Sequence, residues 1–318
     1  MNVPFARAVA VVLCLVASSC GSDSASAPTV APPGLEPSHG DPRTAAWGEI
    51  VASLDAPPEG RPTTSCERGE AACLLAVVEE MEVRLAERPC AHTAPFAFTY
   101  LEMTRGVLAE LDAFDDPALV SVIDARFAQA YFDAFDSWDA GRTDDVPAAW
   151  QLAFATADRG ESPAAVDLLL GMNAHISRDL AYIVERVLAG FDESPERIGD
   201  FEQVNEVIGG VKSPMLEAAA DRFDPSLLLL DIELAVGEAP EPLELIAAWR
   251  SIAFDLGRRL GEAPTSEARI EVVAEIERQA AAGAAVVVAM EAGTGSPSLA
   301  PARRDDYCQE QLDQRQAG

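Results

Sequence analysis

Apolar residues recur every three or four positions along most of the chain between residues 60 and 290. This is the spacing of an amphipathic helix. Runs of strand type, rich in β-branched and aromatic residues, are scarce. The pattern predicts an all-α protein of about ten helices joined by short loops. Because no Pro/Gly/Ser-rich linker divides residues 60–290, we expect one helical domain over about 46–292, followed by a C-terminal tail over 293–318.

Capping residues and prolines indicate where the expected helices begin and end. Asp116-Pro117, Ser162-Pro163 and Thr265-Ser266 are typical of helix starts. Residues 225–236 fit a strand or a helix, and we favour a helix. In chain order, the expected helices cover 47–54, 73–88, 95–114, 117–138, 145–157, 163–189, 200–208, 214–222, 225–236, 242–260 and 266–290.

The most apolar helical segment after the N-terminal leader is 168–182, which lies within the expected helix over 163–189. We expect it to be a buried helix around which the others pack. On a helical wheel, Asn173 falls on its apolar stripe, while His175 and Asp179 lie one turn apart on a flank. Gly171, one turn before His175, would let another backbone approach.

The polar residues of this helix are the candidate functional site, together with Asp124 on the helix through 127. A buried Asn173 needs hydrogen-bond partners. A His175 with Asp179 four residues later is most simply structural, Asp179 orienting His175 and both tying helices together. The alternatives are general base catalysis, with Asp179 fixing the imidazole tautomer, and metal ligation through both side chains. Asp124 could supply a further carboxylate. No cofactor is expected, except one divalent metal such as zinc under the last alternative.

The N-terminal residues predict export and membrane attachment. Arg7 and the apolar run 8–17 are typical of a signal peptide and too short to span a bilayer. Residues 17–21, Ala-Ser-Ser-Cys-Gly, resemble a bacterial lipobox, although Ala17 stands where leucine is usual. This implies cleavage before Cys20 and a lipid on its sulfur; an ordinary signal peptide cut nearby is the alternative. Residues 21–45 read as a disordered tether. The mature protein is expected outside the cytoplasm.

The charge balance excludes some classes of partner. The formal net charge is −30, with Lys212 as the one lysine. Nucleic-acid binding needs a basic face, and so does general adhesion to anionic lipid. The expected membrane contact is therefore the Cys20 lipid, and a small-molecule or protein partner stays open. A solvated acidic surface explains the charge most simply, the alternative being an acidic site for cations or basic partners.

Four cysteines remain after the leader and Cys20, which suggests two disulfides in an oxidising compartment. A helix over 73–88 would place Cys73 and Cys90 about 25 Å apart, whereas a disulfide needs Cα atoms within about 7 Å. The favoured pairs are therefore Cys66–Cys73 and Cys90–Cys308, the second pinning the C-terminal tail to the domain. A metal site is the alternative, but the spacings are not those of zinc knuckles.

The sequence Gly-Met-Asn-Ala-His-Ile-Ser-Arg-Asp-Leu at 171–180 resembles the signature of a bacterial family named domain of unknown function family 5995. Further pieces follow in the same order at 100–104, 124–132, 147–150, 200–205 and 248–250. The resemblance covers about 95–260. It implies an all-helical fold and no particular activity.

The spacing of His175 and Asp179 also resembles, much more weakly, one piece of the zinc-dependent phospholipase C and nuclease superfamily. Those enzymes use several His and Asp ligands and a terminal Trp amine. Here only His39, His92 and His175 are present, so a trinuclear zinc site is excluded and a single metal is not.

Three functions are thus compatible with the sequence. The first is a lipid-anchored extracytoplasmic helical protein that binds a ligand. The second is a cell-surface hydrolase that uses His175 and Asp179, with Asn173 positioning the substrate. One form of this hypothesis is a phospholipase-C-like enzyme with a single metal ion. The third is a structural or interaction role in the envelope.

Overall fold

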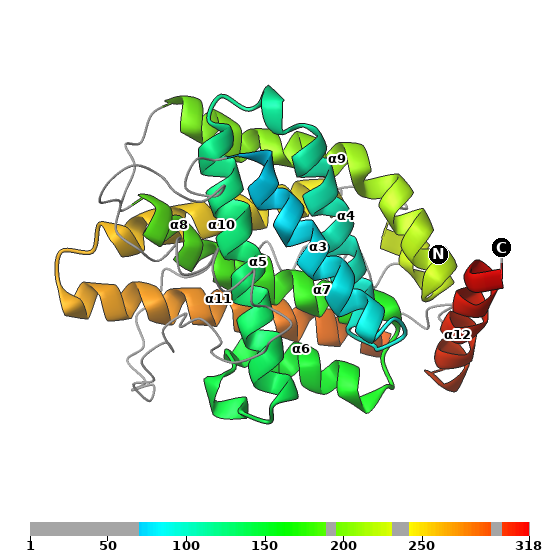
Figure 1. The fold of residues 1–318 in the computed structure, drawn as a ribbon. Helices are drawn as coiled ribbons and strands as arrows, with labels where there is room; N and C mark the ends of the chain where they lie inside the picture. The colour runs from blue at the N-terminus through cyan, green and yellow to red at the C-terminus, as the bar shows by residue number, and fades with distance from the viewer. Residues whose placement is uncertain (1–69, 189–194, 231–241, 294–300, 318) are drawn as a thin grey trace.

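The all-α prediction is confirmed by a computed structural model of the chain, which describes residues 70–188, 195–230, 242–293 and 301–317 (Figure 1). No strand occurs in these ranges. Short 3-10 turns cover Leu111–Ala113, Thr143–Asp145 and Pro225–Leu230, and a π-helical turn covers Ala174–Asp179. The α-helices are α3 Ala71–Glu87, α4 Ala94–Ala109, α5 Pro117–Asp139, α6 Ala148–Arg159, α7 Ala164–Asn173, α8 Leu180–Leu188, α9 Pro195–Arg222, α10 Pro242–Gly261, α11 Ser266–Gly293 and α12 Pro301–Ala317.

All three predicted helix starts are confirmed to within one residue, and two of the three predicted capping side chains act as caps. The Asp116 carboxylate accepts a hydrogen bond from the Leu119 N–H at the start of α5, and the Thr265 hydroxyl accepts one from the Ala268 N–H at the start of α11. The Ser162 cap is wrong, because its hydroxyl instead donates to Asp167 at 2.5 Å. An acidic residue from another part of the chain replaces it: the backbone N–H at the start of α7 donates to Asp224.

The two short helices predicted over 200–208 and 214–222 form one helix, α9. It continues through Pro214, where the missing N–H normally ends a helix. Packing along α4 and the 3-10 turn at 225–230 supports the continuous helix. Asp200 is therefore no helix cap for its own segment. Its two carboxylate oxygens accept the backbone N–H groups of Asp115 and Asp116 and hold the start of α5.

The predicted helix over 163–189 is two α-helices joined by the π turn. α7, the π turn and α8 follow one another without a loop. Helices α4, α5, α6, α10 and α11 pack against different parts of this segment. A π turn has i→i+5 hydrogen bonds and one extra residue, so it rotates the faces on either side of it. For this reason a wheel drawn at 100° per residue does not describe the segment across its whole length.

The core is apolar and rich in aromatic rings. Its largest fully buried side chains include Trp150, Phe132, Phe154 and Phe223. Rings at 131, 135, 150 and 154 contact one another at centroid distances of 5.0–6.0 Å. Edge and stacked contacts of this kind add to the free energy gained from burial. Within the described ranges, no helix combines the length and the apolar character needed to cross a membrane.

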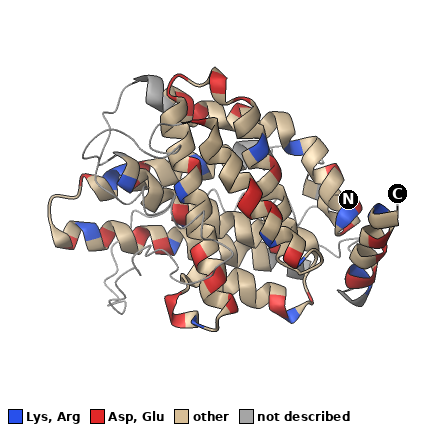
Figure 2. Cartoon of the chain, viewed as in Figure 1, with Lys and Arg blue, Asp and Glu red and all other residues tan. Residues whose placement is uncertain are grey.

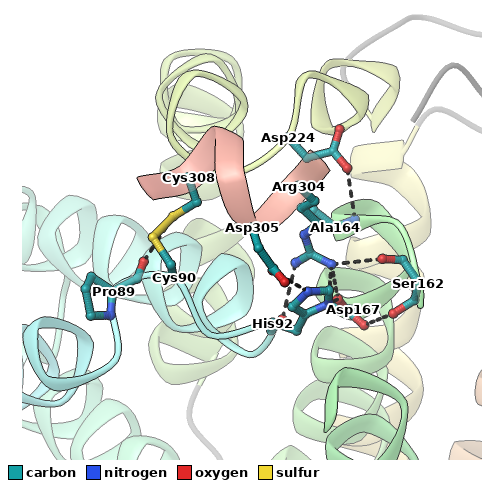
Figure 3. A network of polar contacts seen from close by, with 10 residues as sticks. All are labelled: Pro89, Cys90, His92, Ser162, Ala164, Asp167, Asp224, Arg304, Asp305 and Cys308. Atoms are coloured by element: carbon teal, nitrogen blue, oxygen red, sulfur yellow. Dashed lines mark hydrogen bonds and ion pairs between the residues drawn. A yellow bond between two sulfur atoms is a disulfide. The ribbon is translucent and has the colours of Figure 1, made fainter. Parts of the chain in front are cut away.

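The C-terminal tail departs from its expected irregular form, because residues 301–317 make the helix α12, which packs on α9 (Figure 1). The predicted Cys90–Cys308 disulfide is confirmed, with Cα atoms 5.7 Å apart. Arg304 adds a second attachment (Figure 3). Its guanidinium donates to Asp167 at 2.5 Å, to the Ser162 carbonyl at 2.9 Å and to His92 Nδ1 at 2.8 Å.

Some sequence predictions fall outside the described residues. These are the signal peptide, Cys20, the tether, the helix over 47–54, Cys66 and most of the ambiguous segment, of which only 225–230 is described, as a 3-10 turn.

Acidic residues are spread over many helices and outnumber basic ones (Figure 2). They do not gather on a single element in this view, which agrees with a solvated acidic surface.

The disulfide should contribute strongly to stability, because it closes a loop with a sequence separation of 218 residues. We expect the Cys90→Ser/Cys308→Ser double variant to lose about 2–5 kcal/mol of unfolding free energy. Urea unfolding followed by circular dichroism measures the loss. An unfolding curve identical to that of the native chain would show that α12 is not held by this bond in solution.

Candidate functional site

The π turn brings His175 and Asp179 into contact, and Asp179 is the centre of a buried hydrogen-bond network. Asp179 is 1% exposed. One carboxylate oxygen accepts the Trp150 indole N–H at 2.7 Å and lies 3.3 Å from His175 Nδ1. The other accepts from the Arg178 guanidinium at 2.7 Å. Arg178 continues to Glu277 on α11 at 2.9 Å. The network therefore ties α6 and α11 to the π turn.

The protonation of this pair follows from burial and from the partners. Burial favours a raised pKa for Asp179, but the His175 hydrogen bond and the Arg178 charge outweigh it and lower the pKa. Burial lowers the pKa of His175 despite the attraction of Asp179. The pair is thus a carboxylate beside a neutral imidazole. Because a carboxylate only accepts, the proton is on Nδ1, and Nε2 carries a lone pair.

Aromatic rings surround the imidazole. The Phe127 ring from α5 stacks on it, with centroids 3.4 Å apart and planes 3° from parallel. Phe96 and Tyr100 from α4 make edge contacts at 5.6 Å and 4.6 Å. Trp150 lies at 5.9 Å while it donates to Asp179. These contacts fix the plane of the ring, and the Asp179 bond fixes its rotation, so Nε2 points in one direction.

A cavity of about 80 Å³ lies beside His175, between α4, α5, the π turn, α9 and α10. Its wall is mainly apolar, with a few polar side chains. Met103, Ile123 and Val204 on the wall are half-buried, so the cavity reaches towards the surface. The lining residues are Phe96, Tyr100, Met103, Thr104, Val107, Leu119, Val120, Ile123, Asp124, Phe127, Met172, His175, Ile176, Leu180, Asp200, Phe201, Val204, Ile208 and Arg250.

Five buried polar atoms on this wall have no hydrogen-bond partner within the described part of the chain. They are His175 Nε2, the Tyr100 hydroxyl, the Thr104 hydroxyl, Asp124 Oδ2 and Arg250 Nε. A buried polar atom without a partner costs about 1–3 kcal/mol, and most buried groups in proteins have one. Five such atoms on one cavity therefore indicate a site for a bound molecule or ordered water.

An acidic and a basic side chain, Asp124 and Arg250, also face this cavity. Burial raises the pKa of Asp124 to about 7, and the positive charge of Arg250 acts against this rise. Burial lowers the pKa of Arg250 to about 10, against the attraction of Asp124, so its guanidinium stays charged at neutral pH. Arg250 is also fixed by donating to the Phe201 carbonyl at 2.9 Å, with its guanidinium over the Phe201 ring.

Of the four residues predicted from sequence, three line or support the cavity and one does not. His175 and Asp124 line it, and Asp179 holds His175. Asn173 does not line it: its amide donates to the Ala280 carbonyl on α11 at 2.8 Å. The wheel placed Asn173 on the apolar stripe of one regular helix, but the π turn begins at the next residue and changes the faces that follow it. Asn173 thus joins two helices and lies outside the cavity.

Gly171 also behaves differently from its prediction. The group that approaches it is the Phe96 ring, not another backbone: a Cβ at 171 would lie 2.6 Å from a ring carbon. The glycine is therefore what lets α4 place Phe96 over His175. Tyr100 and Arg250 were seen in the sequence only as parts of the family resemblance. A charged Arg250 among the apolar positions of α10 was the available signal for the cavity.

Metal ligation was the alternative role of His175. Within the described residues, no group of three or more His, Cys, Asp or Glu side chains lies close enough to hold a metal ion. The second carboxylate oxygen of Asp179 is already bound by Arg178, which leaves the pair suited to orienting the imidazole.

Fold and cavity together define an all-helical, single-domain protein with a buried His–Asp pair beside a small, partly polar cavity. A sequence profile for a family of unknown function, DUF5995, matches residues 74–290, more than half of the chain. The chain therefore belongs to this family. No curated protein and no solved structure matches it significantly. The matched range contains all the lining residues and ends before α12.

The contact between Asn173 and α11 gives a direct test of the packing around the π turn. A Cβ at Gly283 would lie 2.1 Å from Asn173 Oδ1. We expect Gly283→Ala to destabilise the protein by about 1–3 kcal/mol through overpacking. Thermal unfolding measures this change.

Gly210→Ala on α9 is the matched control, because nothing lies within 4 Å of its Cβ position. It should stabilise the protein by about 0.5–1 kcal/mol, as alanine does in a helix interior. Equal effects of the two variants would contradict the contact between Asn173 and Gly283.

Proposed function

We propose that the chain is a lipid-anchored, extracytoplasmic protein that binds a small molecule in the cavity beside His175. The observation that carries the proposal is the unpartnered Nε2 of His175. It belongs to a ring that is 2% exposed, and its direction is fixed by Asp179 and Phe127. A polar atom so placed on an apolar cavity is typical of ligand sites, where a few polar groups orient a ligand.

The alternative structural role explains less of the site. Asp179 already has Trp150 and Arg178 as partners, so helix tying does not require an imidazole. A purely structural role for His175 also does not explain why the Tyr100 hydroxyl and the Arg250 Nε are buried on the cavity wall without hydrogen-bond partners within the described residues. A bound molecule would satisfy several of these atoms together.

Binding can be tested with a set of small apolar compounds that carry neutral, anionic or cationic head groups. At least one should raise the thermal unfolding midpoint of the full chain in proportion to the logarithm of its concentration. Tyr100→Phe should lower the affinity for that compound by about 3- to 10-fold. Tyr307→Phe is the control, since this hydroxyl bonds to α9 carbonyls away from the cavity. A set in which no compound shifts the midpoint would refute the proposal.

The membrane anchor rests on the sequence around Cys20, and the Cys90–Cys308 disulfide supports an oxidising compartment. We expect Cys20→Ala to move the protein from the membrane fraction to the soluble fraction and to abolish fatty-acid labelling. Cys14→Ala is the matched control and should remain in the membrane, because position 14 lies in the predicted leader. Membrane-bound, labelled Cys20→Ala protein would contradict the anchor.

A second candidate function is hydrolysis, and the observation in its favour is the His175–Asp179 pair. With the proton on Nδ1, Nε2 could take a proton from a water that attacks an ester in the cavity. Because burial lowers the pKa of His175, the rate should stay constant from neutral pH to below pH 6.5 and fall only in more acidic solution. Measuring the hydrolysis of short-chain esters as a function of pH tests this prediction. If the native chain turns over no ester while Tyr100→Phe still weakens ligand binding, the binding function alone is favoured.

A further inference from the structure

The polar atoms on the cavity wall also define which ligand fits, and this inference rests on the proposed function. Charged wall groups decide the net charge of the ligand, and unpartnered atoms decide its hydrogen bonds. Both can be read from the residues described above. We propose that the cavity binds a neutral apolar alcohol, whose hydroxyl group donates to His175 Nε2 and accepts from Tyr100.

The first step concerns charge. Asp124 and Arg250 face the cavity with opposite signs and act on each other. Asp200 also lines it, but both its oxygens already accept backbone N–H groups of α5. Asp179 is matched by Arg178. Above about pH 7, Asp124 and Arg250 carry opposite charges that act on each other, and the Asp200 charge is stabilised by its two backbone donors. An anionic or cationic ligand would therefore bury a further charge without a free counter-charge on the wall, which is strongly unfavourable.

The second step concerns hydrogen bonds. Neutral His175 with its proton on Nδ1 can only accept at Nε2, so the ligand must carry a donor. Tyr100 stays protonated, because burial raises its pKa well above the ordinary value, and its hydroxyl can donate. The two rings contact each other at a centroid distance of 4.6 Å. One hydroxyl group, which both donates and accepts, serves both atoms.

The third step concerns size and shape. A cavity of about 80 Å³ holds only a few non-hydrogen atoms, because a cavity of about 150 Å³ is known to hold benzene. Phe96 and Phe127 pack against His175, whereas Met103 and Val204 on the same wall are half-buried. A hydroxyl with the first carbons of a chain fits beside His175, while the rest of the chain extends past the half-buried residues towards the surface.

Four matched six-carbon compounds separate the alternatives: 1-hexanol, its methyl ether, hexanoate and hexylammonium. Binding to the full chain is measured by isothermal titration at pH 8, where Asp124 is charged. We expect the affinity for 1-hexanol to be at least about 10-fold higher than the affinity for the ether, which lacks the hydrogen-bond donor. We expect both charged compounds to bind at least about 10-fold more weakly than 1-hexanol.

The Tyr100→Phe variant separates an effect on binding from an effect on folding. Its hydroxyl has no partner within the described residues of the free protein, so the thermal midpoint should be unchanged or slightly higher. Affinity for 1-hexanol should fall by about 3- to 10-fold. Affinity for the ether should fall as well, because its oxygen also accepts from Tyr100. The Tyr307→Phe control should bind both compounds like the native chain.

The failures of the two proposals are distinguishable. Equal binding of the ether and the alcohol would overturn the hydrogen bond to Nε2, and tighter binding of hexanoate or hexylammonium would overturn the neutral class. In both cases the proposed small-molecule site stands. If none of the four compounds binds and the wider compound set also fails, the cavity holds water only and both proposals fall.

Discussion

The hydrogen bonds to the buried Asp179 carboxylate are the constraint on which the site depends. A carboxylate that is 1% exposed is tolerated only because it is neutralised and fully bonded. Arg178 supplies the charge, and Trp150 and His175 supply further hydrogen bonds. These donors come from α6 and from the π turn itself, and Arg178 reaches on to Glu277 on α11. The same bonds that make the carboxylate stable therefore set the geometry of the imidazole.

The π turn explains how one segment performs two tasks. Before it, Asn173 is directed to α11, where Gly283 leaves room for its amide oxygen. Within it, His175 is directed into the aromatic cavity against Phe127. A regular α-helix keeps residues two positions apart about 200° apart around its axis at all points; the extra residue of the π turn changes that relation. Such turns are frequent at functional sites.

The helical class and the His175–Asp179 pair could be predicted from the sequence, because both depend on local spacing. The period of apolar residues showed the helices, and His175 with Asp179 showed a polar pair at i and i+4. Features that depend on tertiary contacts were missed. The cap of α7 comes from Asp224, sixty residues away. Pro214 lies inside a helix, and residues 301–317 form a helix held by Cys308 and Arg304. No local pattern contains these partners.

The central claim is that His175 offers a bare Nε2 to the cavity, and its ring nitrogens can be observed directly. Nitrogen-15 NMR of histidine-labelled protein, assigned with His39→Gln and His92→Gln variants, reports the tautomer and charge of His175. The predicted result is a mainly neutral ring with its proton on Nδ1 at pH 6.5, since burial lowers its pKa below that value, and an Nε2 signal that moves when 1-hexanol is added. A proton on Nε2 of the neutral ring, or a mainly charged imidazolium at pH 6.5, would contradict it.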